Sequence, residues 1–497
     1  MCWASVLQYA SSSFCEVAFT ARSQPQERRS IVLVLQHACR SIIKQKRSVV
    51  DVVHTLLSLQ QRMRPLLVAA LVASGTALDP LAARLAAHKV LRETGKETPA
   101  ALLARHTTRL DEREKRFAAD LVEKCHRHAA EIDALLDEAC ERRPRGSTLQ
   151  ILRLGVAQLL YFDSVPNRAA VDTSVQLCKK RGGNPGLTNA VLRRLSRETP
   201  SIQETKPPLY DLLVKDRGAE LADRYLEACR KPPAMLQVTC ASSEKRDQLI
   251  EAVDGATQSY GDFGVALRPY KRTPVPALPL FDEGVWWAQD AGAAQAARLL
   301  KGLPTGSKVL DMCSAPGGKA LQLSSFGFEV VAVEKSTNRA ARLRQNLQRC
   351  RCNVDVRVQD ATRVEGMFDG VLVDAPCSAT GTARRRPDVL RKDLDLEALA
   401  ATQAALLDAA WRCLKPGGLL VFSSCSALTA DAEASFAAFL ERTADAHLVE
   451  VAAAELGFVD NDSVVDGALR LWPWHVASDV GGCDAHYAAR VRKGGSE

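Results

Sequence analysis

The chain has 497 residues, of which 46% are apolar, and it carries a net charge of +8. This length suggests about three domains, and the mildly basic charge is compatible with nucleic acid as a partner. The 15 cysteines include no Cys-x-x-Cys pair, and no apolar run approaches the roughly 18 residues that span a bilayer. These features argue against a disulfide framework, a metal site and a membrane anchor, so we expect a cytoplasmic, monomeric protein without a bound metal.

Residues 1–78 form an N-terminal extension that matches no later pattern in the chain. The segment up to residue 80 holds nine Lys and Arg residues against four acids. An Arg-rich, acid-poor leader is typical of a transit peptide. The alternative is an extension from a mis-called start, with Met63 as the true initiator, and the sequence leaves both interpretations open.

Residues 79–200 are predicted to form a domain of helices only. Apolar residues recur three and four positions apart over 83–91, and the same spacing runs through 121–136. The segment 152–161 is almost wholly apolar, which predicts a helix at the centre of a bundle.

This helical domain resembles a NusB-like RNA-binding domain. The features that carry the resemblance are the run 152–161, the break at Val165-Pro166, Ala170-Val171-Asp172 and the ending Asn189-Ala-Val-Leu-Arg-Arg194. It implies a targeting module that contacts RNA rather than a catalytic one. We place Arg193 and Arg194 at the RNA-facing surface, although a solvated basic face would have the same sequence.

Residues 201–278 are predicted to form a small α+β domain, since prolines punctuate this part of the chain. Its expected strands are 235–239 and 264–267, and its expected helices include 219–229 and 245–253.

From residue 279 to 495, strands and helices alternate, which predicts an α/β domain with a parallel sheet. The strand 308–312 runs into the loop Cys313-Ser314-Ala315-Pro316-Gly317-Gly318-Lys319 and then into a helix. Glycines at such a turn let the backbone approach a ligand, and the helix N-terminus offers free N–H groups. The loop lacks the G-x-G-x-x-G spacing of dinucleotide-binding proteins, which counts against NAD.

Three acids follow successive strands of this predicted sheet. Glu334 ends the second strand, a position from which an acid can bind ribose hydroxyls. Asp360 follows the third strand and could accept a hydrogen bond from an adenine amino group, and Asp374 ends the fourth. Because no second phosphate site is evident, an adenosine with a sulfonium tail fits better than a dinucleotide.

Two cysteines follow consecutive buried strands of the same sheet. Cys377 lies in Asp374-Ala-Pro-Cys377, and Cys425 follows the apolar strand 419–422, 48 residues later. Either cysteine alone would more often be a core residue. Two thiols at one edge of the sheet, beside a ligand loop, favour a catalytic function.

These motifs resemble those of the Sun/RsmB family of RNA cytosine-C5 methyltransferases. The matching stretches are Cys313–Lys319, Asp374–Thr382 with Arg385-Arg386-Pro387-Asp388, and Ser424-Cys425-Ser426. With the NusB-like domain the resemblance covers about residues 80–495, and this pairing points to the bacterial enzyme that modifies 16S ribosomal RNA. It implies a class I, Rossmann-like methyltransferase domain that binds S-adenosylmethionine through residues 313–319, Glu334, Asp360 and Asp374.

The resemblance also assigns the two thiols, which the residues alone leave undecided. Cys425 is expected to attack C6 of the target cytosine, and Cys377 to assist release of the product. Asp374 would stabilise the protonated ring near N3. Arg384, Arg385 and Arg386 follow the Cys377 loop and are expected to contact RNA phosphates.

The sequence departs from the family pattern at four places. Glu334 stands where Asp is usual, Ser424-Cys425 replaces Thr-Cys, and Gln237-Val238-Thr239 replaces Arg-Val-Asn. The stretch Cys483-Asp-Ala-His-Tyr-Ala488 matches only part of the family's Asp-Gly-Phe-Phe-Tyr-Ala ending.

Two other functions are alternatives to the 16S enzyme. One is C5 methylation of tRNA or another RNA, and the other is a non-catalytic RNA-binding or antitermination factor that has kept the fold.

Overall fold

The computed structural model describes residues 79–95, 97–198, 205–268, 273–457 and 461–495. The chain separates into one unit up to Ala82 and a second from Ala83 to Glu497. The predicted extension 1–78, with Met63, lies outside the described residues, so both interpretations of it stay predictions.

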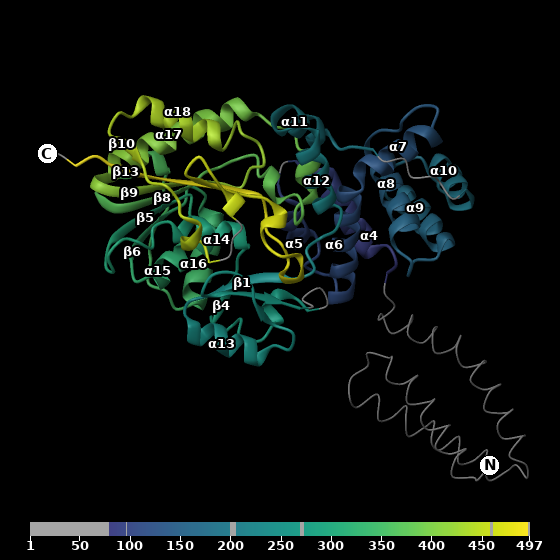
Figure 1. The fold of residues 1–497 in the computed structure, drawn as a ribbon. Helices are drawn as coiled ribbons and strands as arrows, with labels where there is room; N and C mark the ends of the chain where they lie inside the picture. The colour runs from purple at the N-terminus through teal and green to yellow at the C-terminus, as the bar shows by residue number, and fades with distance from the viewer. Residues whose placement is uncertain (1–78, 96, 199–204, 269–272, 458–460, 496–497) are drawn as a thin grey trace, which may run out of the picture. The chain divides into compact units, whose positions relative to one another are not determined.

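The described residues before 199 form a helical bundle, as predicted (Figure 1). Its helices are α4 (Ala82–Glu93), α5 (Pro99–His106), α6 (Glu112–Arg127), α7 (Ala129–Ala139), α8 (Gly146–Tyr161), α9 (Asn167–Arg181) and α10 (Pro185–Arg197). α8 is the central helix, and a Cβ atom on its Gly155 would lie 2.5 Å from Leu192 Cδ1 of α10. A glycine therefore lets these two helices pack closely.

The apolar spacing over 121–136 continues across two helices rather than one. α6 ends at Arg127, and the N–H group of His128 caps it by donating to Lys124 O. α7 begins at the next residue, Ala129. The spacing alone does not reveal the break, because Ala129, Ile132 and Leu136 are buried on the far side of it.

A small antiparallel sheet follows two helices, α11 (Pro208–Arg217) and α12 (Ala219–Cys229). Its order is β2-β3-β1-β4, made of β1 (Leu236–Cys240), β2 (Thr257–Gln258), β3 (Gly264–Leu267) and β4 (Trp286–Ala288), with α13 (Ser243–Ala252) beside it. β4 pairs with β1 but lies beyond residue 278, so the small sheet extends past the predicted boundary. α11 and α12 pack instead on the catalytic part, where buried Tyr225 donates from its hydroxyl to Thr380 O at 2.5 Å.

The large sheet is mixed rather than wholly parallel. Its strands are β5 (Lys308–Met312), β6 (Glu329–Val333), β7 (Asp355–Arg357), β8 (Phe368–Asp374), β9 (Leu414–Ser424), β10 (Ala446–Leu448), β11 (Val464–Val465), β12 (Ala468–Leu471) and β13 (His486–Lys493). The order is β11-β12-β13-β9-β8-β5-β6-β7, with β10 paired to β13. Strands β5 to β9 run parallel, as predicted, whereas β10 to β13 add an antiparallel part that strand–helix alternation did not predict.

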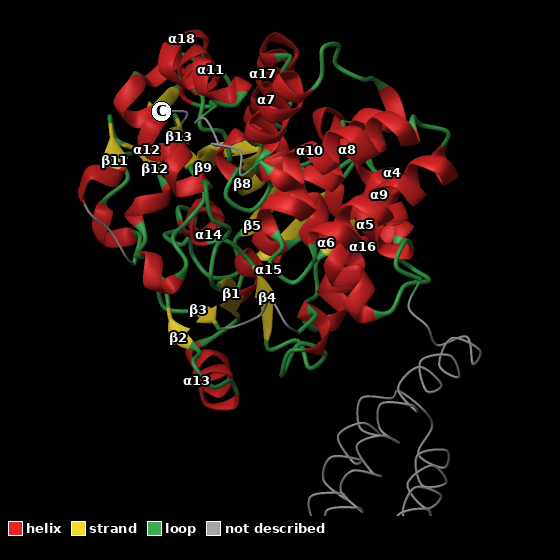
Figure 2. Cartoon of the chain, turned by 90° about the vertical axis from the view of Figure 1, so that its right-hand side faces the viewer, coloured by secondary structure: helices red, strands yellow, loops and turns green. Residues whose placement is uncertain are grey.

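Helices cover both faces of the large sheet, which Figure 2 shows as strands enclosed by helices. α14 (Ala291–Arg298), α15 (Gly318–Ser325) and α16 (Thr337–Arg349) share one apolar cluster with one face. α17 (Leu396–Cys413) and α18 (Glu433–Arg442) share another cluster with the opposite face. This is a Rossmann-like fold, and it confirms the predicted multidomain architecture. None of the described helices is long and apolar enough to cross a bilayer.

Candidate active site

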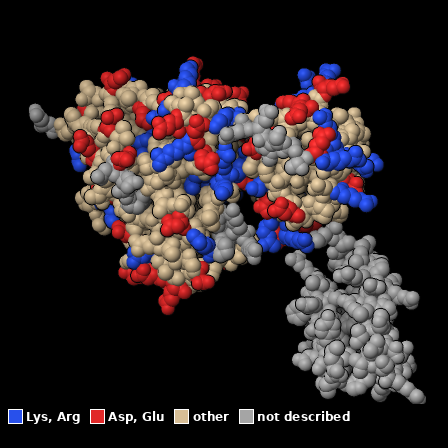
Figure 3. All heavy atoms as spheres, turned by 45° about the vertical axis from the view of Figure 1, so that its right-hand side comes forward, with Lys and Arg blue, Asp and Glu red and all other residues tan. Residues whose placement is uncertain are grey.

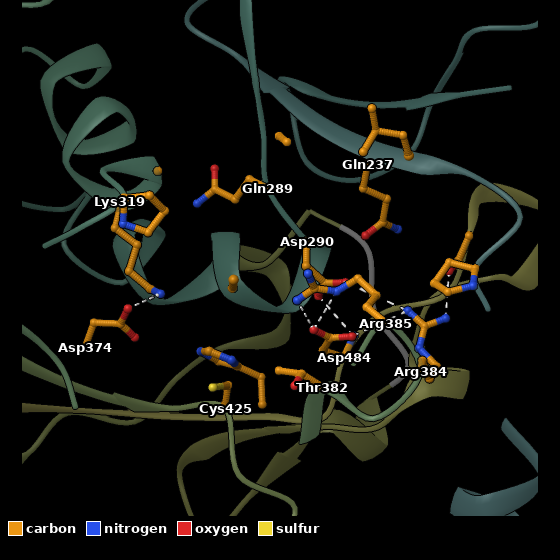
Figure 4. Close-up of a pocket in the computed structure, with 18 of the residues that line it drawn as sticks. Gln237, Gln289, Asp290, Lys319, Asp374, Thr382, Arg384, Arg385, Cys425 and Asp484 are labelled. Carbon is orange, nitrogen blue, oxygen red and sulfur yellow. Dashed lines mark hydrogen bonds and ion pairs between the residues drawn. The ribbon is translucent and has the colours of Figure 1, made fainter. Parts of the chain in front are cut away.

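A cavity of about 400 Å³ lies at the carboxyl ends of β5, β8 and β9 (Figure 4). It is lined by four parts of the chain: the small sheet with the start of α14, the loop 313–319, the ends of β8 and β9 with the loop after β8, and residues 481–486. Ligands of open α/β sheets bind at this edge. The parallel order of the strands therefore brings part of the ligand loop, Asp374 and Cys425 together at one cavity.

The predicted ligand loop turns into α15 at this cavity. Ser314, Pro316, Gly318 and Lys319 line it. Gly317 has a φ of 106°, and a Cβ atom there would lie 2.5 Å from Leu343 Cδ1, so the turn requires glycine. The loop can thus present the N-terminal N–H groups of α15 to a ligand.

Lys319 and Asp374 form an ion pair inside the cavity, with 2.8 Å between Lys319 Nζ and Asp374 Oδ2. Burial alone would lower the pKa of Lys319, but the carboxylate of Asp374 more than offsets this, and the net shift is upward. The ammonium group therefore stays charged beside the thiol of Cys425, which lines the same cavity.

The two predicted catalytic thiols meet, since Cys377 Sγ and Cys425 Sγ are 3.4 Å apart. The β8–β9 pairing sets Asp374 opposite Ser423, so the segments that follow both strands leave the sheet side by side. Of the two cysteines, Cys425 is the one that lines the cavity. Cys425 therefore faces the cavity, and Cys377 lies behind it within contact distance of its sulfur.

The hydrogen bond between the thiols shifts their pKa values in opposite directions. The hydrogen bond between the two thiols lowers the pKa of Cys377 against the opposing effect of burial, and Ser424 adds to the lowering. The same bond raises the pKa of Cys425, and burial and Asp374 raise it further, against the charge of Lys319.

The acids predicted to bind the cofactor follow β6 and β7. Glu334 is buried, and its Oε1 accepts from Ser336 N at 2.8 Å. Its Oε2 makes no hydrogen bond with the described residues and lies 3.3 Å from Arg339 Nη1. A buried carboxylate oxygen with unused capacity fits a ribose hydroxyl. Asp360 is more exposed, and Lys335 lowers its pKa through a hydrogen bond of 2.8 Å. Neither residue lines the cavity that holds Cys425.

Cys313 does not have the character of a third reactive thiol. Burial, aided by Asp374 and Glu334, raises its pKa to about 12. Cys313 is the first residue of the ligand loop and is half-buried.

Asp311 is an acid near the site that the sequence analysis missed. It is fully buried within β5, and its Oδ2 accepts from Ser314 Oγ at 2.6 Å. Burial raises its pKa to about 7. An isolated acid inside the apolar strand 308–312 was the signal that could have identified it.

A second polar cluster lines the opposite side of the cavity and was also missed. Asp290 caps α14 and accepts from Asp484 N at 3.0 Å, and Arg385 donates to the Asp484 carboxylate (Figure 4). Gln237 joins the small sheet to this cluster by donating to Gly482 O and accepting from Ala291 N. Three distant segments form the cluster, so no sequence spacing could reveal it.

The predicted RNA-contacting arginines have different surroundings. Arg384 is buried, donates to Gly481 O at 2.8 Å and lies near two carboxylates, which does not favour it as a phosphate contact. Arg385 lines the cavity with its side chain 46% exposed, and Arg386 pairs with Asp388 at 3.0 Å. Arg193 and Arg194 are exposed on α10 and do not line the cavity.

Two family models match the chain. The model described as 16S rRNA methyltransferase RsmB/F matches residues 299–491, and the NusB family model matches residues 75–197.

Known proteins match over most of the chain. It is 34% identical over 401 residues to ribosomal RNA small subunit methyltransferase B of Xanthomonas campestris pv. campestris, covering 76% of this chain and 91% of that protein. The protein of the same name from Shewanella oneidensis is 36% identical over 322 residues, covering 60% and 74%. Among solved structures, the crystal structure of PH0851 superposes with a TM-score of 0.68 at 19% identity, covering 84% of this chain and 99% of that one. That likeness concerns the fold alone.

Proposed function

This chain belongs to the RsmB/F family of ribosomal RNA methyltransferases, and from that premise we propose that it methylates C5 of one cytidine in 16S ribosomal RNA. The observation that carries the proposal is the 3.4 Å contact between Cys377 and Cys425 beside the Lys319–Asp374 pair. Cytosine C5 is a poor nucleophile, and a thiol that adds at C6 makes it reactive. A second thiol within reach of the first suits a reaction in which that bond must later break.

S-adenosylmethionine is the methyl donor, and it supplies an electrophilic methyl group on a sulfonium sulfur. The loop 313–319, Glu334, Asp360 and Asp374 would hold it. The turn at Gly317 and the unused oxygen of Glu334 fit an adenosine cofactor.

Each thiol gives up its proton once in the proposed reaction. Cys425 loses its proton to solvent as its sulfur forms a bond with C6, and the electron pair of the C5–C6 double bond becomes available at C5. After methylation C5 loses its proton to water, the C–H electron pair re-forms the C5–C6 double bond, the S–C6 bond breaks with its electrons on sulfur, and Cys377 gives its own proton to the departing Cys425 sulfur. The lowered pKa of Cys377 makes it the readier proton donor of the two thiols in this last step.

Asp374 and Lys319 act on the base in this scheme. The Asp374 carboxylate faces the cavity and would stabilise positive charge at N3 as Cys425 adds. Lys319 holds one oxygen of that carboxylate and so fixes its orientation.

RNA contacts beyond the target base are proposed on two surfaces. The first consists of predicted arginines at two places: Arg193 and Arg194 are exposed on α10, and Arg385 and Arg386 lie at the cavity or near it. The other is a cavity of about 740 Å³ where the bundle meets α12, lined by six Lys and Arg residues against three acids. Figure 3 shows basic side chains gathered near this junction. Such surfaces bind the phosphate backbone without reading its sequence.

The alternatives are less well supported. The relatives are named for small-subunit ribosomal RNA, which favours that substrate over tRNA. A non-catalytic RNA-binding factor would have no need of two adjacent thiols at a ligand cavity. Methylation of isolated 16S RNA compared with tRNA, with the product nucleoside identified by mass spectrometry, separates these functions.

The roles of the two thiols are tested by trapping the covalent intermediate. Cys377→Ala should accumulate a protein–RNA adduct on denaturing gels, because the expelled sulfur no longer regains its proton. Cys425→Ala should form none. An adduct in Cys425→Ala but not in Cys377→Ala would reverse the roles, and no adduct in either variant would contradict covalent catalysis.

A further inference from the structure

His486 is a buried imidazole in the wall of the cavity that the proposed reaction leaves without a role. It is the first residue of β13, its exposed fraction is 1%, and it is one of the residues that line the cavity. Because buried polar groups are usually hydrogen-bonded, we expect this ring to have a hydrogen-bond partner.

A chain of hydrogen bonds connects His486 to Asp374. His486 Nε2 lies 2.8 Å from Ser423 Oγ, and Ser423 Oγ donates to Asp374 Oδ1 at 3.4 Å. The other carboxylate oxygen, Oδ2, is held by Lys319. Asp374 is therefore held on both oxygens, and Ser423 is fully buried between the two side chains it contacts.

The direction of these bonds follows from what each group can donate. The Ser423 hydroxyl has one proton, and the neighbouring carboxylate is its strongest acceptor. His486 must then carry its hydrogen on Nε2 and donate it to Ser423, which leaves Nδ1 as an acceptor. Nδ1 makes no hydrogen bond within the described chain, and a buried acceptor without a partner is more common than a buried N–H without one.

The charges around the ring keep it neutral. Burial, followed by Lys319 of α15 and Arg470 of β12, lowers the pKa of His486 well below its usual value. Asp374 of β8 is the acid that it reaches through Ser423, and the start of α14 packs against its Cβ near Gly292. A neutral ring can donate from Nε2 without adding a second cation beside Lys319.

We infer that His486 is a positioning residue for methyl transfer, acting through Ser423 on Asp374. A donor on the Ser423 oxygen leaves the hydroxyl proton free to point at Asp374, and this fixes the carboxylate that faces the base. The inference rests on the proposed function, because it assigns Asp374 the same task at the base.

Three variants test this chain of bonds. His486→Phe keeps the ring shape without a donor, Ser423→Ala removes the link, and His486→Gln replaces the imidazole donor with an amide donor at a similar reach. At saturating RNA and S-adenosylmethionine we expect His486→Phe and Ser423→Ala each to lower the methylation rate roughly tenfold, with the KM for RNA unchanged. The double variant should be no slower than either single one, because both break the same chain. His486→Gln should restore about a third of the rate.

His88 provides the matched control. It is a fully buried histidine of α4 whose ring nitrogens make no hydrogen bonds within the described chain, so His88→Phe should leave the rate unchanged. Additive losses in the double variant, a His486→Gln rate as low as that of His486→Phe, or a wild-type rate in Ser423→Ala would each overturn the inference. Ser423→Ala carries the test alone if His486→Phe does not fold.

Two further measurements tell failure of the positioning role from failure of the proposed function: the activity of Asp374→Asn and the identity of the methylated nucleoside. If Asp374→Asn abolishes formation of 5-methylcytidine while the His486 and Ser423 variants are fully active, only the positioning role is wrong. If the wild-type product is another nucleoside, the proposed function fails first.

Discussion

At the scale of single residues, the site contains an acid, Asp311, whose buried carboxylate lowers the stability of the folded state when it is ionised. Asp311 is fully buried, its Oδ1 makes no hydrogen bond within the described chain, and its pKa is raised to about 7. A raised folded-state pKa means that folding takes up a proton between the unfolded value, near 4, and about 7. Stability is therefore lost as pH rises through that interval.

Asp311→Asn should remove this dependence. The free energy of unfolding of the variant should gain about 3 kcal/mol relative to wild type between pH 5 and pH 8, because each pKa unit is worth roughly 1.4 kcal/mol. Urea unfolding at several pH values measures this difference. Asp408→Asn, at an exposed position of α17, should track wild type across the range. A constant difference between Asp311→Asn and wild type would show that Asp311 does not titrate in this interval.

At the scale of elements, the sequence predicts the parallel half of the large sheet and misses the rest. Strands 308–312 and 329–333 and the loop between them were predicted at their observed bounds, because apolar runs and glycines mark them locally. The strands β10 to β12 are only two to four residues long and lack alternation. β13 is longer, but nothing local shows that it pairs with β9.

The site divides along the same line. Cys377, Cys425, Lys319 and Asp374 follow parallel strands or their loops, so the topology alone brings them together. The other residues of the site come from distant parts of the chain. His486 begins β13, Gln237 lies in the small sheet, Asp290 caps α14 and Asp484 precedes β13, so only long-range pairing brings them to the cavity. Local motifs thus mark the two thiols and the acids that follow parallel strands, but no local motif marks the residues that hold those side chains in place.

The helical bundle contributes directly to the loop beside the active site. Arg127 of α6 has a side chain that is 2% exposed, and it donates to Cys229 O and, at 2.9 Å, to Arg384 O. Arg391 of the same loop pairs with Asp133 of α7 at 2.6 Å. The residue after Arg384 is Arg385, which reaches the cavity. The bundle thus holds a loop of the catalytic part in place.

Arg127→Met should slow methylation even of a short RNA that is too small to reach the bundle. Two buried carbonyl groups would lose their donor, at roughly 1–3 kcal/mol each, and the loop at Arg384 would loosen. We expect a roughly tenfold lower rate with S-adenosylmethionine affinity retained, measured by methyl transfer and calorimetry. Arg113→Met, at an exposed position of the same helix, is the control. Equal rates for both variants would show that the bundle does not support the site.

At the scale of the whole molecule, both regions that match a family lie beyond residues 1–62 of the N-terminal extension. The matched NusB region begins at residue 75. Deleting residues 1–62 should therefore leave methylation of ribosomal RNA within about twofold of wild type. A deletion that extends through residue 93 should instead destabilise the bundle, because it removes α4 with buried Ala83, Ala87 and Val90. Lost activity in the shorter deletion would assign the extension a function.

The position of β13 bears on how the protein is made. This strand is the last of the sheet to be synthesised, yet it lies between β12 and β9 and also pairs with β10. While residues 486–493 remain inside the ribosomal exit tunnel, β9 has an open edge and Ser423 has no imidazole to bond. A nascent chain can complete its Cys377 and Cys425 loops earlier, but its catalytic sheet closes only after those residues emerge. The sheet that carries Asp374 and Cys425 is therefore complete only after residues 486–493 have emerged and paired with β9.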